Sequence, residues 1–187
     1  MDDIQKLKTA IDDLQNRLRE EIQLRTELER RCHLLEKLAY RDPSSGLRTE
    51  TYLHARVREE IERSIRYPAA TTLVTLCVPD DAADALPRLG MHLTDELRST
   101  DQVFSLNRRG LAILLVETPE EGARHLLERL GSDLKQFVKR YGCTVTSFPV
   151  DANLAEDFMN LAIERHKGMT EKMHADGSAG QVSQSMH

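Results

Sequence analysis

Two charged residues three positions apart, Arg98 and Asp101, are the candidate ligand-binding pair of this sequence. An arginine presents a planar fork of hydrogen-bond donors, and an aspartate accepts donors, so the pair could hold one small ligand that carries an anionic group. An arginine and an aspartate at this spacing near a helix end can equally form a local ion pair, worth about a few tenths of a kcal/mol. The two residues alone leave both interpretations open.

Two further arginines, Arg108 and Arg109, lie in a short polar turn between apolar runs. They could grip a phosphate, although arginines in an exposed turn are more often solvated. The seven histidines show no metal-ligand spacing, and the three cysteines are too few and too widely spaced for a disulfide framework or a zinc site. The sequence therefore predicts neither a metal site nor a cofactor.

The chain has 187 residues, enough for one globular domain and an accessory segment. Its net charge of -5 argues against a general nucleic-acid binder, which needs a clustered basic surface. No apolar run is long enough to span a bilayer, and the N-terminus lacks a signal-peptide pattern. We therefore expect a cytoplasmic protein that binds neither nucleic acid nor membrane.

Residues 1–40 predict a long coiled-coil helix, because residues 2–40 contain no glycine or proline and their apolar residues repeat in heptads. A parallel homodimer is the simplest way to bury such a seam; the alternative is a single solvated helix. Glu21 and Arg25 fall inside the seam, while Ile22 and Leu24 fall off it, so the middle of the coil is weak or offset. The seam residues are Ile4, Leu7, Ile11, Leu14, Leu18, Leu28, Cys32, Leu35 and Ala39.

Residues 41–174 predict one α/β domain, followed by a disordered tail over residues 175–187. A hairpin with Asn107 to Gly110 as its turn, combined with crossover helices, favours a sheet with an antiparallel portion flanked by helices. The expected helices span about 48–66, 80–97, 119–140 and 153–172, and the expected strands span 71–78, 102–106, 111–116 and 143–148.

Several strings in this domain, taken in order, resemble the GGDEF family, whose active members make cyclic di-GMP from two GTP. Leu97-Arg98-Ser99-Thr100-Asp101 is followed, after five residues, by Asn107-Arg108-Arg109-Gly110-Leu111 and an apolar strand; the family reads L-R-x-x-D, five residues, then G-G-D-E-F. Asp42 to Leu47 resembles the family's entry string D-x-L-T-G-L, and Thr144 to Pro149 resembles its last strand. The resemblance covers roughly residues 38–166 and implies the nucleotidyl-cyclase-like sheet.

The family's catalytic residues are missing at the matching positions. Asn107-Arg108-Arg109-Gly110-Leu111 replaces the signature turn, so the acidic pair that helps hold divalent metal is lost, and two arginines oppose a cation there. The strand that should end in a metal-binding aspartate ends in Leu76-Cys77-Val78-Pro79, Asp80 falls a step too late, and the base-binding asparagine has no counterpart. The resemblance thus implies a degenerate domain that is not an enzyme.

Arg98 and Asp101 match the family's RxxD inhibitory site, at the family's distance before the signature turn. There the arginine contacts phosphate and a guanine edge, and the aspartate accepts from the guanine. The resemblance also implies that Arg129, or less well placed Arg124, could complete a ligand bound by a neighbouring subunit.

Two functions follow from these observations. The first is a non-catalytic cyclic di-GMP receptor that signals through its coiled coil. The second is a ligand-free dimerisation scaffold that docks another signalling protein. Binding of GTP without turnover is a weaker third, because the glycines and metal aspartates are gone.

Overall fold

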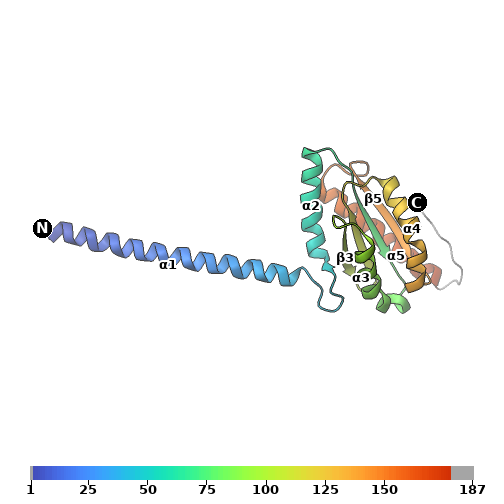
Figure 1. The fold of residues 1–187 in the computed structure, drawn as a ribbon, viewed down its shortest axis with the longest axis horizontal. Coiled ribbons are helices and arrows are strands. Elements are labelled where there is room, and N and C mark those ends of the chain that lie inside the picture. The colour runs from blue at the N-terminus through green and yellow to red at the C-terminus, as the bar shows by residue number, and fades with distance from the viewer. Residues whose placement is uncertain (1, 178–187) are drawn as a thin grey trace. The chain divides into compact units, whose positions relative to one another are not determined.

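The computed structural model describes residues 2–177 and divides into two compact units, which meet in the sequence between Ala39 and Tyr40. The first unit is the single helix α1, Asp2–Ala39 (Figure 1). Its large apolar side chains are at least half exposed wherever they are described. They are Ile11, Leu14, Leu18, Ile22, Leu24, Leu28 and Leu35.

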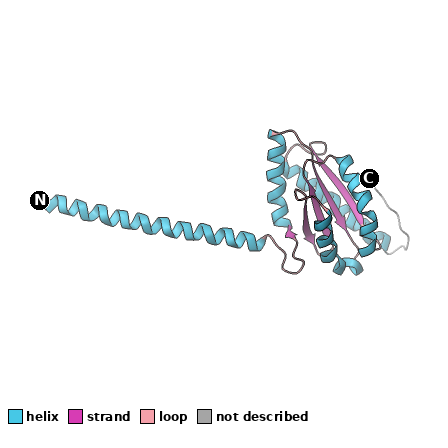
Figure 2. Ribbon diagram, viewed as in Figure 1, coloured by secondary structure: helices cyan, strands magenta, loops and turns pink. Residues whose placement is uncertain are grey.

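The second unit is a mixed α/β domain (Figure 2). Its strands are β1 Arg48–Thr49, β2 Thr71–Cys77, β3 Gln102–Asn107, β4 Gly110–Leu115 and β5 Gly142–Phe148. Its helices are α2 Glu50–Arg66, the short 3-10 helix η1 Asp80–Ala85, α3 Leu86–Glu96, α4 Glu120–Phe137 and α5 Ala155–Gly177. Within the described residues, no helix is long and apolar enough to cross a membrane.

Several boundaries differ from the sequence predictions; the predicted helix 119–140, for example, is α4 and ends at Phe137. The predicted helix 48–66 begins only at Glu50, because Thr49 caps it by accepting from the Tyr52 amide, and β1 precedes it. The predicted helix 80–97 is η1 followed by α3, with Pro87 in the first turn, where a missing amide does no harm. Helix α5 continues to Gly177, three residues into the range predicted as tail; the rest of that range lies outside the described residues.

The five strands form one sheet in the order β1-β3-β4-β2-β5. The pairs β3–β4, β4–β2 and β2–β5 are antiparallel, and the two-residue strand β1 runs parallel to β3. The predicted antiparallel hairpin is therefore present as β3 and β4. Strand β1 escaped prediction because two residues carry no periodicity.

Helices cover both faces of the sheet (Figure 1). On one face α3 and α4 pack against alternate residues of the central strands, such as Val74 and Ile113. On the other face α2 and α5 pack against the intervening residues, such as Leu73 and Phe104. Every residue of β2 and β4 is buried, as expected for strands covered on both sides.

The outer strand β5 has its free edge covered by an ion pair. Arg165 of α5 donates to the Val145 carbonyl at 2.7 Å and to both carboxylate oxygens of Asp151 at 2.9 Å. Asp151 in turn accepts from the Ser147 amide at 2.8 Å. The Arg165 guanidinium holds the pKa of Asp151 below its usual range. Because an open strand edge invites pairing with other chains, this clamp also protects the sheet.

We predict that Asp151→Ala lowers the free energy of unfolding by about 2 kcal/mol, because it removes charge-assisted hydrogen bonds and strands the Ser147 amide. Urea unfolding measures the change. Glu156→Ala, which removes an exposed acid from the first turn of α5, is the matched control and should cost about 0.5 kcal/mol.

The depressed pKa adds a pH signature to the same experiment. The Asp151 carboxylate contributes stability above its unfolded pKa, and that contribution disappears as the pH falls through its lower folded pKa. The difference between wild type and Asp151→Ala should therefore shrink in acid. Equal stabilities of the two proteins at neutral pH would contradict the clamp.

Candidate functional site

The turn of the β3–β4 hairpin is fixed by backbone contacts. Asn107 Oδ1 accepts from the Arg109 amide at 2.9 Å, which closes the turn locally. The Arg109 carbonyl accepts from the Val78 amide at 3.0 Å, just beyond the end of β2. The turn therefore lies directly beside the end of the central strand.

The Arg109 side chain reaches two groups near this strand end. Its Nη1 lies 3.2 Å from Oδ2 of Asp80, the first residue of η1, and also donates to Nε2 of His174 on α5. The guanidinium thus places a positive charge beside the hairpin turn and pairs with the Asp80 carboxylate. A divalent cation would have to displace it.

Below the turn, His166 of α5 packs against Gly110. A Cβ atom on Gly110 would lie 2.7 Å from the imidazole ring, so no larger residue fits there without movement. His166 is 5% exposed, and its Nε2 lies 3.4 Å from Asn107 Nδ2. Burial, and then the charge of Arg109, lowers the pKa of His166. The imidazole is therefore neutral at physiological pH.

Metal-dependent phosphoryl transfer relies on carboxylates clustered around divalent metal ions. Among the residues whose side chains the structure describes, no three histidine, cysteine or acidic side chains are grouped to hold a metal ion. What the hairpin offers instead is a guanidinium already paired with Asp80.

Asp101 lies at the opposite end of β3, about 20 Å from Asn107 at 3.3 Å per residue. It follows a tight turn in which its own amide donates to the Arg98 carbonyl at 3.0 Å. Its Oδ1 accepts from the Val116 amide at 3.4 Å, just after β4. Partial burial raises the pKa of Asp101, and the hydrogen bond from Val116 and the charge of Arg98 oppose that rise.

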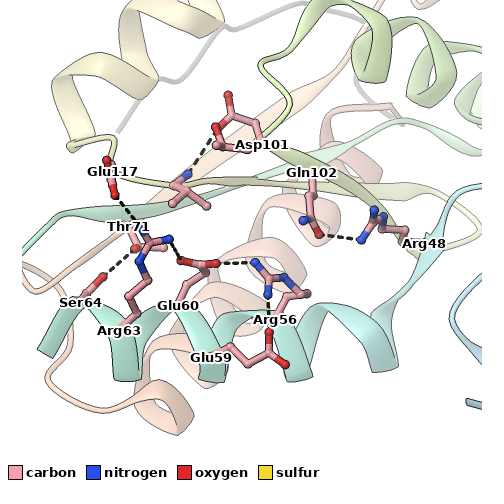
Figure 3. A network of polar contacts seen from close by, with 12 residues as sticks. Arg48, Arg56, Glu59, Glu60, Arg63, Ser64, Thr71, Asp101, Gln102 and Glu117 are labelled. Atoms are coloured by element: carbon pink, nitrogen blue, oxygen red, sulfur yellow. Dashed lines mark hydrogen bonds and ion pairs between the residues drawn. The ribbon is translucent and has the colours of Figure 1, made fainter. Parts of the chain in front are cut away.

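A polar network braces the sheet edge around Asp101 (Figure 3). The next residue, Gln102, accepts from Arg48 of β1 at 3.0 Å. Glu117, which follows Val116, accepts from Arg63 of α2 at 3.1 Å. These two contacts tie residues next to Asp101 and Val116 to β1 and α2.

The other predicted ligand residues stand apart from Asp101. Arg98 is exposed, and among the described residues no group accepts a hydrogen bond from its guanidinium. Arg124 of α4 is paired with Glu120 at 2.6 Å, and Arg129 of the same helix is exposed. The structure thus brings Arg98 and Asp101 together in one turn and does not bring Arg124 or Arg129 into hydrogen-bond contact with them.

Sequence reasoning missed the residues that line the hairpin. His166 and His174 show no metal-ligand spacing in the sequence, and Asp80 follows the strand end too late for a metal ligand. These residues come from η1 and α5, far from the hairpin in sequence. Only the packing of α5 across the sheet brings the two histidines to Arg109 and Gly110, and no local pattern indicates it.

No protein-family profile matches this sequence, and no curated relative matches it either. Solved structures do match. The diguanylate cyclase SiaD of Pseudomonas aeruginosa, in complex with its activator SiaC, has a TM-score of 0.61 at 20% identity, covering 92% of this chain and 72% of that one.

Two GGDEF domains match the globular unit in the same way. The FimX GGDEF domain of Pseudomonas aeruginosa has a TM-score of 0.60 at 16% identity, covering 71% of this chain and 94% of that one. A microbial GGDEF domain described in a novel interaction mode with cyclic di-GMP has a TM-score of 0.58 at 17% identity, covering 70% and 89%.

The unit that begins at Tyr40 therefore has the fold of GGDEF domains, the fold of diguanylate cyclases. This confirms the fold expected from the sequence. The identities are low, so the likeness concerns the fold and leaves the activity to be argued from the residues.

We predict that Gly110→Ala destabilises the domain by about 1–3 kcal/mol, because the new methyl group must push the buried His166 ring or the hairpin out of place. Gly168→Ala is the control, since this glycine lies inside α5 and an added methyl group would point into open space. The control should stabilise the protein by about 0.5–1 kcal/mol. Thermal unfolding compares them, and a neutral Gly110→Ala would contradict the packing described for His166.

Proposed function

We propose that this chain is a non-catalytic, cytoplasmic receptor for cyclic di-GMP that binds its ligand at Arg98 and Asp101. One observation carries the proposal. Asp101 Oδ1 is held by the Val116 amide, while Oδ2 accepts no hydrogen bond from any residue in the described part of the chain. A fixed carboxylate with one open oxygen lies in the same turn as an unengaged guanidinium.

The chemistry of the pair suits a guanine nucleotide. A carboxylate accepts from the two neighbouring donors of a guanine edge, and an arginine fork binds a phosphate or the guanine acceptors. Partial burial of Asp101 strengthens this, because donors from a ligand would restore the solvation that the carboxylate has lost. A matching solved structure concerns the interaction of a GGDEF domain with cyclic di-GMP.

Arg129 or Arg124 could supply a further cation to the same ligand from a neighbouring copy. Both lie on α4, and Arg129 is the more available because it is exposed while Arg124 is paired with Glu120. An arginine from a second copy would make ligand binding also an assembly step. The exposed apolar seam of α1 supports a homodimer through this helix.

The same proposal excludes cyclase activity. Arg109 lies where the signature turn of an active domain would hold metal, and it is engaged with Asp80 and His174. The Asp80 carboxylate is thus paired with the Arg109 guanidinium rather than with a metal ion.

The second candidate function is a ligand-free scaffold that docks another signalling protein. The exposed seam of α1 favours it, because such a surface needs a partner whether or not a nucleotide binds. One matching structure is a cyclase bound to an activator protein.

We predict no cyclase turnover. Incubation with GTP and either Mg²⁺ or Mn²⁺ should yield no cyclic di-GMP above a reaction without enzyme, measured by chromatography. Detectable product would mean that Arg109 gives way to metal, and it would overturn the non-catalytic assignment.

We predict that cyclic di-GMP binds in the micromolar range, about -8 kcal/mol. Arg98→Ala should weaken binding about thirtyfold, or about 2 kcal/mol, because it removes a charge-assisted contact. Arg88→Ala, an exposed arginine on α3, is the matched control and should leave the affinity unchanged. Isothermal titration calorimetry measures all three proteins.

The affinity should also fall in acid. Ligand donors need the ionised Asp101 carboxylate, whose pKa is raised in the free protein, so binding weakens as the pH drops towards that pKa. Absence of binding to wild type would favour the scaffold. Equal losses in Arg98→Ala and Arg88→Ala would mean that the ligand responds only to general charge.

A further inference from the structure

The seam of α1 contains two polar residues of opposite charge at its centre. Continuing the heptads from Ile11 and Leu14 assigns Glu21 to a d position and Arg25 to an a position. Both side chains are exposed, and Arg25 is paired only with Glu29 of its own helix, among the residues described, at 2.9 Å. The partner that buries this seam must accommodate both charges.

A parallel, in-register second copy accommodates them poorly. Each seam residue then faces its own counterpart, so Glu21 meets Glu21 and Arg25 meets Arg25 in adjacent buried layers. Ile22 and Leu24, which flank the seam at the e and g positions, would lie beside Arg17 and Glu29 of the second copy. Isoleucine at a and leucine at d near the N-terminal end of the seam suit a parallel pair. The like charges that would meet at Glu21 and Arg25 disfavour it.

An antiparallel second copy resolves every central layer. Antiparallel coiled coils pack a positions against d positions, and a twofold axis at residue 23 pairs each seam residue with the one equally far beyond the axis. The two polar layers then become Glu21 with Arg25 and Arg25 with Glu21. The apolar layers are Leu18 with Leu28, Leu14 with Cys32, and Ile11 with Leu35.

The residues that fall off the seam also gain partners in this arrangement. Antiparallel helices bring e beside e and g beside g, so Ile22 meets Ile22 and Leu24 meets Leu24 across the twofold axis. These side chains are 55% and 62% exposed in the single chain. Ile22 and Leu24, the residues that depart from the heptad pattern, would then lie at the centre of the interface.

One contact disfavours this pairing, because Arg17 would lie beside Arg31 of the second copy. Each is already paired within its own helix, Arg17 with Asp13 at 3.0 Å and Arg31 with Glu27 at 2.9 Å. Both lie at the exposed flank, where charge interactions are weak and screened, whereas the Glu21 and Arg25 layers lie in the seam. The central layers therefore decide the direction.

We propose that α1 binds α1 of a second copy in the antiparallel direction, centred on residue 23. In that pair the two Tyr40 residues would lie about 50 Å apart along the coil axis at 1.5 Å per residue.

Cysteine crosslinking of the full chain tests the direction, because Cys32 is exposed while Cys77 is buried. In the antiparallel pair the two Cys32 residues are about 27 Å apart. Mild oxidation should therefore leave wild type uncrosslinked. Leu14→Cys should give a covalent dimer, with peptide mapping showing a link between positions 14 and 32.

The control variant is Leu14→Cys combined with Cys32→Ser, in which the introduced thiol faces a serine and should not crosslink. A link between two Cys32 residues in wild type, or between two position-14 thiols in the control, would show a parallel coil. A single species without crosslinks in all three proteins, monomeric by sedimentation, would show that α1 does not pair with itself. Either result overturns the proposal, and titration with cyclic di-GMP tests the site at Arg98 and Asp101 separately.

Discussion

The seating of the β3–β4 hairpin on α5 is the constraint on which the functional account depends. Gly110 leaves just enough room for the His166 ring, and the ring in turn fixes how closely α5 approaches the sheet. That approach brings His174 to the Arg109 guanidinium, which also engages Asp80. The packing therefore places the positive charge of Arg109 beside Asp80, just beyond the end of β2.

The two ends of strand β3 differ in whether their charged groups are already paired. Its far end is the hairpin, where the Arg109 guanidinium is engaged by Asp80 and His174. Its near end carries Asp101, whose carboxylate is anchored on one oxygen and open on the other, beside Arg98, whose guanidinium donates no hydrogen bond to the described residues. The two ends of β3 therefore present different groups, and the proposed ligand site uses only the end at Asp101.

Much of this could be predicted from sequence, and the limits are physical. The buried run of β2, the hairpin at Asn107 and the spacing of Arg98 from that turn are local patterns, and they led to the right fold. Strand β1 is too short to show a period. The contacts of His166, His174 and Arg165 depend on where α5 crosses the sheet. The open oxygen of Asp101 depends on the hydrogen bond that Val116 donates to the other oxygen. Both features arise from tertiary packing, so no local sequence pattern predicts them.

Hydrogen exchange with and without cyclic di-GMP tests the central claim most directly, because it shows where the ligand acts. The account predicts slower exchange in the turn of residues 97–101 and at the Val116 amide, whose acceptor is Asp101. The hairpin amides of residues 107–110 should be unchanged. Protection confined to the hairpin, with none around Asp101, would contradict the claim that Arg98 and Asp101 form the ligand site.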